Sequence, residues 1–89
     1  MDIKSVGVVG AGQMGNGIAH VLAVAGYDVL LNDISEDNLS RALAQIDKNL
    51  ERQVSREKIT AEDKAAALAR IKTTLKLTDL GPSDLIIEA

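Results

Sequence analysis

Three glycines near the start of the chain have a spacing that suits the binding of phosphate. An apolar run ends in Gly10, and Gly12 and Gly15 follow at G-x-G-x-x-G spacing, directly before an amphipathic helical pattern. Gly10 allows a sharp turn out of a strand, Gly12 keeps side-chain atoms away from a pyrophosphate, and Gly15 lets the next helix pack closely on a sheet. The start of that helix presents free backbone N–H groups and the positive end of its dipole to the phosphates.

One acid completes the pattern. Asp33 comes eighteen residues after Gly15, at the end of the next apolar run, residues 27–31. A carboxylate there can accept hydrogen bonds from an adenosine ribose, so strand, glycines, helix, strand and acid in this order predict dinucleotide binding. The same carboxylate would repel the 2′-phosphate of NADP, and Ile34-Ser35 offers no neighbouring arginine, so the pattern favours NAD.

The elements that position these groups alternate between strand and helix. We expect strands at about residues 3–9, 27–32, 72–77 and 84–88, and helices at about 13–25, 35–54 and 60–71. Gly26 is a natural stop for the first helix, and Ser35 is a natural N-cap for the second. Thr60 and Asp63 have the spacing of a capping box at the third helix. The pattern predicts an α/β fold: an incomplete Rossmann-type, doubly wound parallel sheet of order 3-2-1-4, with an inserted helical-hairpin arm at about residues 36–72.

The spacing of apolar residues predicts the buried face of each helix. The expected stripe of the first helix is Met14, Ile18, Val21, Leu22 and Ala25; that of the second is Leu39, Leu43, Ile46 and Leu50; that of the third is Ala65, Leu68, Ala69 and Ile71. His20, the single histidine, falls outside the first stripe. We therefore expect it at the surface and assign it no catalytic role.

Composition excludes several classes of function. The net charge is −3, which argues against nucleic-acid binding. The absence of cysteine excludes disulfides and thiolate metal sites, and no cluster of acids and histidine suggests a metal site. No serine has a base beside it in any motif, so nucleophilic catalysis has no support. No apolar stretch is long enough to span a bilayer, and the first residues lack the features of a secretion signal, so a cytoplasmic protein is expected.

The last residues predict a piece of a longer protein. Residues 84–89 form an apolar strand pattern without a following helix to cover it. We therefore expect residues 1–89 to be the N-terminal part of a dinucleotide-binding domain, with the rest of that domain and a C-terminal domain absent. An isolated chain would expose the edge of its fourth strand and is expected to self-associate.

Three segments in order resemble the N-terminal NAD-binding part of the 3-hydroxyacyl-CoA dehydrogenase family, most of all its short bacterial 3-hydroxybutyryl-CoA type. They are Gly10–Ala19, Lys58–Lys64 and Asp84–Ala89. The resemblance implies oxidation of the 3-hydroxyl of an L-3-hydroxyacyl-CoA to a 3-keto thioester, with hydride passing to NAD. The family's catalytic residues lie beyond position 89, so none is assigned here and the isolated chain is expected to be inactive. A homo-oligomeric parent enzyme is implied as well.

The resemblance also implies further contacts with the cofactor and with coenzyme A. Gln13 and Met14 would lie at the helix N-terminus beside the pyrophosphate, and Ala89 would lie where the backbone passes the cofactor. The family's helical arm flanks CoA, which favours contacts to CoA phosphates or ribose from Asn49, Arg52, Arg56 and Lys58. On charge alone, these cations also fit a solvated helix face balanced by Asp47, Glu51 and Glu57.

Other functions stay open at this point. The chain could be a non-catalytic nucleotide-binding module, or an interaction surface whose glycine loop is unused. It could also belong to a related β-hydroxyacid dehydrogenase, although such enzymes often prefer NADP through a basic residue near the position that Asp33 occupies here.

Overall fold

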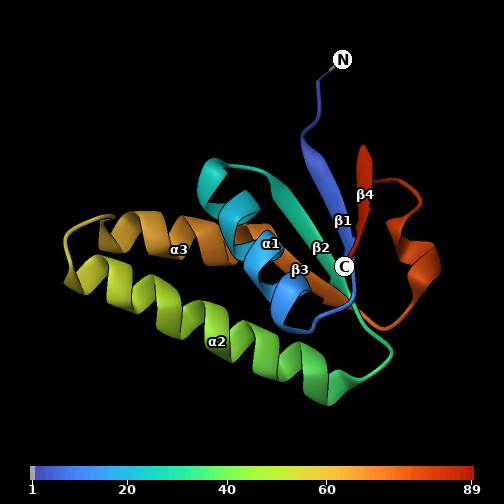
Figure 1. Ribbon diagram of the computed structural model, residues 1–89. Helices are drawn as coiled ribbons and strands as arrows, with labels where there is room; N and C mark the ends of the chain where they lie inside the picture. Colours follow the sequence, from blue (N-terminus) through green and yellow to red (C-terminus); the bar gives the residue numbers. More distant parts are fainter. Residues whose placement is uncertain (1) are drawn as a thin grey trace.

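Four parallel strands form the centre of the molecule. The computed structural model describes residues 2–89, and its strands are β1 (Ser5–Val9), β2 (Asp28–Asn32), β3 (Ile71–Thr74) and β4 (Leu85–Glu88). Their order in the sheet is β3-β2-β1-β4, which confirms the predicted α/β architecture and sheet order (Figure 1). The strands draw on Val, Leu and Ile, as buried parallel strands commonly do.

The helices lie on one face of this sheet. They are α1 (Gln13–Ala25), α2 (Glu36–Ser55) and α3 (Ala61–Arg70), and a short 3₁₀ helix, η1, spans Leu77–Leu80. The connections from β1 through β2 to β3 advance toward one edge, so right-handed crossovers place all three α-helices on the same face. The chain then returns to β4 through η1 on the opposite face, where an added Cβ on Gly7 would lie 2.8 Å from Cγ of Leu80.

Local signals set the helix ends as predicted. Gly26 ends α1 in the left-handed conformation, at a φ of 105°, and its N–H bonds back to the last turn. Ser35 caps α2, because its hydroxyl accepts a hydrogen bond of 3.2 Å from the N–H of Asn38. Thr60 and Asp63 form both bonds of a capping box at α3, each of 3.0 Å. The helical arm ends at Arg70, since the next residue already belongs to β3.

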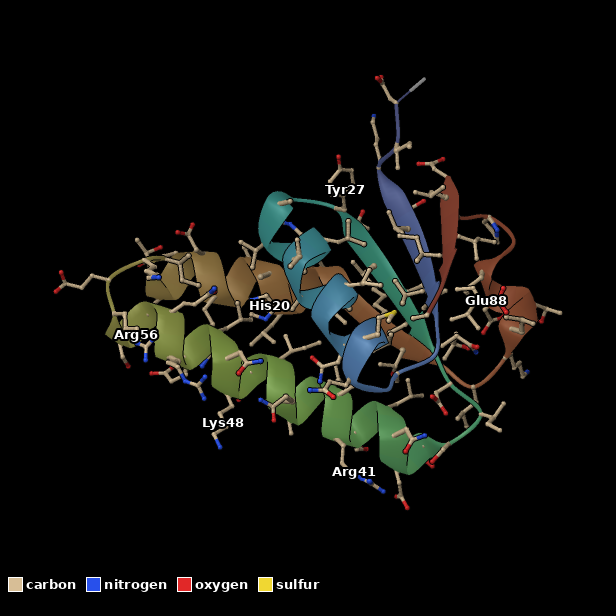
Figure 2. All side chains as sticks on the ribbon, in the orientation of Figure 1. His20, Tyr27, Arg41, Lys48, Arg56 and Glu88 are labelled. Carbon is tan, nitrogen blue, oxygen red and sulfur yellow. The ribbon has the colours of Figure 1, made fainter. Side chains whose placement is uncertain are left out.

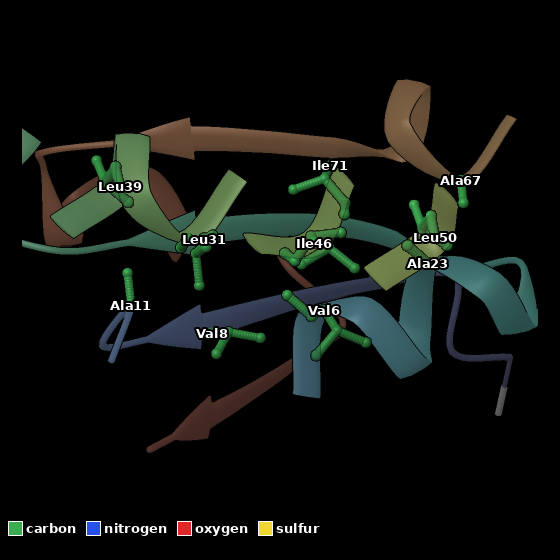
Figure 3. Packing of buried hydrophobic residues seen from close by; sticks show 13 residues of the cluster. Val6, Val8, Ala11, Ala23, Leu31, Leu39, Ile46, Leu50, Ala67 and Ile71 are labelled. Atoms are coloured by element: carbon green, nitrogen blue, oxygen red, sulfur yellow. The ribbon is translucent and has the colours of Figure 1, made fainter. Parts of the chain in front are cut away.

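The core lies between the sheet and the helices (Figure 3). From α2 it receives Leu39, Ala42, Ile46 and Leu50, so the predicted stripe is confirmed except that Ala42 is buried where Leu43 is only half-buried. The turn between α2 and α3 is the part of the arm farthest from the strands (Figure 1). Thus one side of α2 packs in the core, although the end of the helix that leads to α3 extends beyond the sheet.

The predicted face of α1 was right only in part, since Ile18 and Leu22 are half-buried against the core. Its buried residues are Gly15, Ala19 and Ala23, whereas Met14 and Val21 are 68% and 65% exposed. The helix lies so close to the loop and sheet that small residues are needed on the contact side. The spacing of large apolar residues therefore identified Ile18 and Leu22 but missed the small residues that form the centre of the contact.

Two further expectations need correction. In α3 the buried residue is Ala67, while Ala65 and Ala69 are exposed. The third strand was expected to run to Leu77, but it ends at Thr74, which pairs with the last residue of β2. Beyond that point β2 has turned away into the loop, so no partner strand remains.

Candidate nucleotide-binding site

The glycine loop leaves the sheet at the carboxyl end of β1. Gly10 has a φ of 100°, a left-handed conformation that favours glycine, and its N–H donates to the carbonyl of Asn32 over 2.7 Å. On its other side, an added Cβ would lie only 3.0 Å from the carbonyl oxygen of Ala89. The loop is therefore held between the end of β2 and the residue that follows β4.

Gly15 and Gly12 have different surroundings. A Cβ on Gly15 would lie 1.7 Å from the carbonyl oxygen of Gly10, so this glycine is required for α1 to pack against the loop. A Cβ on Gly12 would meet nothing within 4 Å and would point into open space. The loop thus leaves room at Gly12, where a pyrophosphate is expected, and none at Gly15.

The first turn of α1 is open to an anion. Gly12 occupies the N-cap position and has no side chain to cap the helix, and no acid lies in the first turn. The first N–H groups of a helix have no partner within the helix, so those of Gln13 and Met14 are free to bind phosphate oxygens. Both residues are exposed, beside the open space at Gly12.

Asp33 ties the loop to the next strand. One carboxylate oxygen, Oδ2, accepts a hydrogen bond of 2.9 Å from the N–H of Ala11. The other, Oδ1, accepts bonds from the N–H of Ser35 at 2.9 Å and from Nδ2 of Asn38 at 3.2 Å. The pKa of Asp33 is lowered, first by the bond from Ala11 and then by that from Ser35, because both stabilise the ionised form.

The carboxylate keeps capacity for a further donor. An ionised carboxyl group has about four lone-pair sites, and the structure uses three of them. The remaining site belongs to Oδ2, the oxygen bonded to the glycine loop. A ribose hydroxyl could therefore donate to Asp33 without displacing any bond that holds the loop.

A groove of about 560 Å³ adjoins the loop. One wall is the loop and the first turns of α1, and the other is α2; the lining residues are Ala11, Gly12, Gln13, Asn16, Gly17, Asn38, Arg41, Ala42, Gln45 and Asn49. Its volume lies within the range of about 300–1,000 Å³ that is typical of ligand sites. Of the predicted cofactor contacts, Gly12 and Gln13 line this groove, whereas Asp33 does not and is linked to it through its bonds to Ala11 and Asn38.

Sequence analysis missed Asn38 and Arg41 in this groove. Both lie on α2, on a polar stripe beside the buried stripe of Leu39, Ala42 and Ile46. Arg41 is the only charged residue that lines the groove within residues 2–89, and Figure 2 shows its side chain extending outward from α2. The helical period of α2, counted from its N-cap, could have placed both residues on this side.

A second cavity, of about 410 Å³, lies farther along α1 and α2. Its lining residues are Gly17, His20, Val21, Asn49, Arg52, Gln53, Arg56 and Lys58. The cavity therefore brings together all four residues for which contacts with CoA were expected. The two cavities adjoin, since both are lined by Gly17 and Asn49. The alternative of a solvated helix face stays open, because Arg52, Arg56 and Lys58 are all exposed. Local pairing is not what balances them, since Asp47 and Glu51 form ion pairs with Lys64 of α3, at 3.0 and 2.6 Å.

His20 departs from expectation. It is half-buried rather than on the open surface, and its imidazole lies between α1 and α2 (Figure 2). Its Nδ1 is buried and has no hydrogen-bond partner within residues 2–89. The sequence pattern places His20 outside the large apolar stripe of α1, but it does not show that α2 covers this side.

Two other site classes lack support in the part of the chain that the structure describes. Among residues 2–89, no group of three or more His, Asp or Glu side chains could hold a metal ion. None of the helices in this range is long and apolar enough to cross a membrane.

Comparison with known proteins gives a consistent result. The family model for the NAD-binding domain of 3-hydroxyacyl-CoA dehydrogenase matches residues 5–89. A 3-hydroxybutyryl-CoA dehydrogenase from Bradyrhizobium diazoefficiens is 59% identical over 86 residues, which cover 97% of this chain and 29% of the relative. A 3-hydroxyadipyl-CoA dehydrogenase from Escherichia coli is 42% identical over 89 residues, which cover 100% of this chain and 19% of the relative.

Solved structures agree with this result. The crystal structure of (S)-3-hydroxybutyryl-CoA dehydrogenase from Ralstonia eutropha matches with a TM-score of 0.95 and 46% identity, over 99% of this chain and 31% of that one. The chain thus spans less than a third of the length of the relatives it matches.

Proposed function

The chain belongs to the NAD-binding domain family of 3-hydroxyacyl-CoA dehydrogenases, and from this premise we propose how its residues hold NAD. The proposal rests above all on one arrangement: Asp33 binds the glycine loop and keeps an acceptor site free beside it. The pyrophosphate would lie over Gly12 and accept hydrogen bonds from the first N–H groups of α1, at Gln13 and Met14. Gly10 and Gly15 would support this contact by holding the loop against α1.

The adenosine half of the cofactor would be bound at Asp33. A ribose hydroxyl would donate to the free site on Oδ2, and Asn38 would keep the carboxylate in place through its bond to Oδ1. Asp33 is ionised at neutral pH, as an aspartate is at its ordinary pKa and all the more with its pKa lowered, so a 2′-phosphate would meet a negative charge. Ala89, whose N–H bonds to the carbonyl of Val9 over 2.9 Å, extends β4 to the loop and would border the cofactor.

For the whole protein, we propose the oxidation of an L-3-hydroxyacyl-CoA to the 3-keto thioester. NAD supplies the hydride acceptor in this reaction, and the described residues supply its binding site. No residue among 2–89 is assigned as the general base, since the single histidine lies between α1 and α2 rather than at the strand ends. The 59% identity to a 3-hydroxybutyryl-CoA dehydrogenase favours a short acyl chain. A cytoplasmic, homo-oligomeric enzyme stays a prediction.

We propose that the second cavity binds the phosphate or ribose groups of CoA. Arg52, Arg56 and Lys58 supply three positive charges, and Asn49 supplies a side-chain amide whose Oδ1 already accepts a bond of 3.0 Å from Gln45. Charge-assisted hydrogen bonds from guanidinium groups suit phosphate oxygens well. The cavity adjoins the proposed NAD groove, as an enzyme with both ligands requires.

A chimeric enzyme tests the proposed activity. This chain would replace the 86 matching residues of the Bradyrhizobium diazoefficiens relative, and NADH-dependent reduction of acetoacetyl-CoA would be measured. We expect turnover in the chimera and an increase in KM for NADH of about tenfold or more in its Asp33→Ala form, since a hydrogen bond to a charged group is worth about 1.5–3 kcal/mol. A folded chimera that binds neither NADH nor acetoacetyl-CoA would contradict the proposal.

A further inference from the structure

Gly17 is an exposed glycine in the interior of α1. Its φ is not positive, and an added Cβ would meet no atom within 4 Å, so neither backbone conformation nor packing within residues 2–89 requires glycine there. Inside a helix, glycine is less favourable than any residue except proline, because it loses the most backbone freedom. Gly10 and Gly15, by contrast, are required by the turn and by the close approach of α1. A residue that breaks the local rule without a packing reason points to a functional one.

The position of Gly17 between two cavities supplies such a reason. Gly17 and Asn49 line both the groove and the second cavity, so the missing side chain lies where the two meet. The cavities follow one another along α2, since Arg41 of the groove lies near the start of this helix and Arg56 of the second cavity near its end (Figure 2). A side chain at Gly17 would narrow the passage between them. The glycine therefore leaves α1 open to close approach by a ligand that occupies both cavities.

The two cavities differ in the chemistry of their side chains. The second cavity carries the positive charges of Arg52, Arg56 and Lys58. Five side chains of the groove end instead in carboxamides, and they are Gln13, Asn16, Asn38, Gln45 and Asn49. Within the described residues, the groove is lined by no carboxylate and by one cation, Arg41. A ligand that fits both cavities is therefore anionic at one end and carries uncharged hydrogen-bonding groups along the rest of its length.

Gln45 and Asn49 together offer the partners of an amide group. They lie one turn apart on α2, and Nε2 of Gln45 donates to Oδ1 of Asn49 over 3.0 Å. This bond uses a donor of Gln45 and the acceptor atom of Asn49. It leaves Oε1 of Gln45 as an acceptor beside Nδ2 of Asn49 as a donor. A secondary amide has one N–H and one C=O, so it complements this pair.

We propose that the groove and the second cavity form one track for CoA, and that the amide-bearing arm of CoA crosses α1 at Gly17. The phosphates lie in the cationic second cavity, an amide of the arm pairs with Gln45 and Asn49, and the sulfur end points toward the glycine loop. The inference rests on the proposed function, because it takes CoA as the ligand of the second cavity. It goes further, since it assigns the arm of CoA to the groove along α2 and gives Gly17 a role in substrate binding.

Calorimetry with two ligands tests the track. CoA spans all of it, whereas adenosine 3′,5′-bisphosphate carries phosphates on the same nucleoside but has no arm. Each ligand is titrated into the chain with NADH in excess, so that the glycine-loop site is filled. We expect Gly17→Ala to weaken CoA binding about fivefold to tenfold, because the added methyl group displaces the arm. The affinity for the bisphosphate should change by less than about twofold.

Three further variants separate the parts of the track. Gly17→Leu should weaken CoA binding more than Gly17→Ala does. Ala44→Leu introduces the same side chain at an exposed position of α2 that lines neither cavity, so it should leave CoA binding unchanged. Gln45→Met keeps the length of the side chain but removes its amide, so CoA affinity should fall about threefold to tenfold while that of the bisphosphate stays the same. Thermal unfolding shows that the fold is kept, since Gly17→Ala should raise Tm.

The outcomes separate this inference from the proposed function. Equal CoA affinities of wild type and Gly17→Ala would overturn the crossing at Gly17 and leave the CoA cavity standing. Equal losses for CoA and the bisphosphate would also overturn it, because the obstruction would then lie at the phosphates. If Gly17→Ala weakened NADH binding in the absence of CoA and left CoA binding unchanged, the whole groove would belong to the dinucleotide. No binding of CoA by a chain that binds NADH would overturn both the track and the CoA cavity, while the NAD site would stand.

Discussion

Replacement of Gly15 by alanine tests the tightest contact of the proposed cofactor site. The new Cβ would lie 1.7 Å from the carbonyl oxygen of Gly10 and 2.8 Å from its carbonyl carbon. A carbon–oxygen contact needs about 3.3 Å, so loop and helix must separate by roughly 1.6 Å. Neither side can move easily, because Gly10 is bonded to Asn32 and because Ala19 and Ala23 are completely buried along the same side of α1.

The expected cost follows from two opposing effects. Overpacking costs about 1–3 kcal/mol, and contact with backbone atoms argues for the upper end. Alanine regains about 1 kcal/mol over glycine through helix propensity. The net loss is about 2 kcal/mol in the free energy of unfolding, or roughly 8–16 °C in Tm for a domain of this size. Urea denaturation followed by far-UV circular dichroism measures it.

Two neighbouring glycines are matched controls for Gly15. Gly17→Ala adds a methyl group in the same helix with nothing within 4 Å, and it should stabilise the chain by about 0.5–1 kcal/mol. In Gly12→Ala the new Cβ also meets no atom within 4 Å, so the free energy of unfolding should change by less than about 0.5 kcal/mol. The same methyl group should block the pyrophosphate and abolish NADH binding. If Gly15→Ala proved as stable as Gly17→Ala, the packing argument would be refuted.

Three further predictions concern acid stability, the second face of the sheet and its edge. The folded-state pKa of Asp33 is lowered, so its ionised carboxylate stabilises the fold above the unfolded-state pKa of about 3.9. This contribution to the free energy of unfolding is lost as the pH falls through the folded-state pKa. When stability is measured against pH in the acid range, Asp33→Asn should flatten this part of the profile. Leu80→Ala should cost about 2–5 kcal/mol in urea denaturation, since Leu80 is 1% exposed against Gly7; a loss below about 1 kcal/mol would show that η1 is not packed as described. The edge strand β4 exposes Ile86, so light scattering should detect self-association that Ile86→Lys reduces; a monodisperse monomer at high concentration would oppose it.

The features that the sequence predicted are those that local chemistry determines. The bounds of α1, the cap at Ser35 and the capping box at Thr60 depend on a few neighbouring residues, and the structure shows each of them. The strand order follows from the right-handed crossover rule applied to alternating elements. Gly10 and Asp33 could be selected because strand ends and turn geometry restrict which residues fit there.

The features that the sequence did not predict depend on packing between distant segments. The buried face of α1 is formed by small residues, and a pattern based on large apolar residues cannot detect a helix that must approach a loop closely. The end of β3 depends on where its partner β2 ends, at the pair Asn32 and Thr74. His20 is covered by α2, which begins sixteen residues later in the chain.

Titration of the chain with NADH and with NADPH, before and after Asp33→Ala, tests the central claim most directly. The account predicts saturable NADH binding, weaker binding of NADPH, and a loss of NADH affinity of about tenfold or more in the variant. The difference between the two cofactors should shrink in the variant, because the charge that repels the 2′-phosphate is gone. Equal affinities of wild type and variant for NADH would contradict the role of Asp33 in holding the ribose.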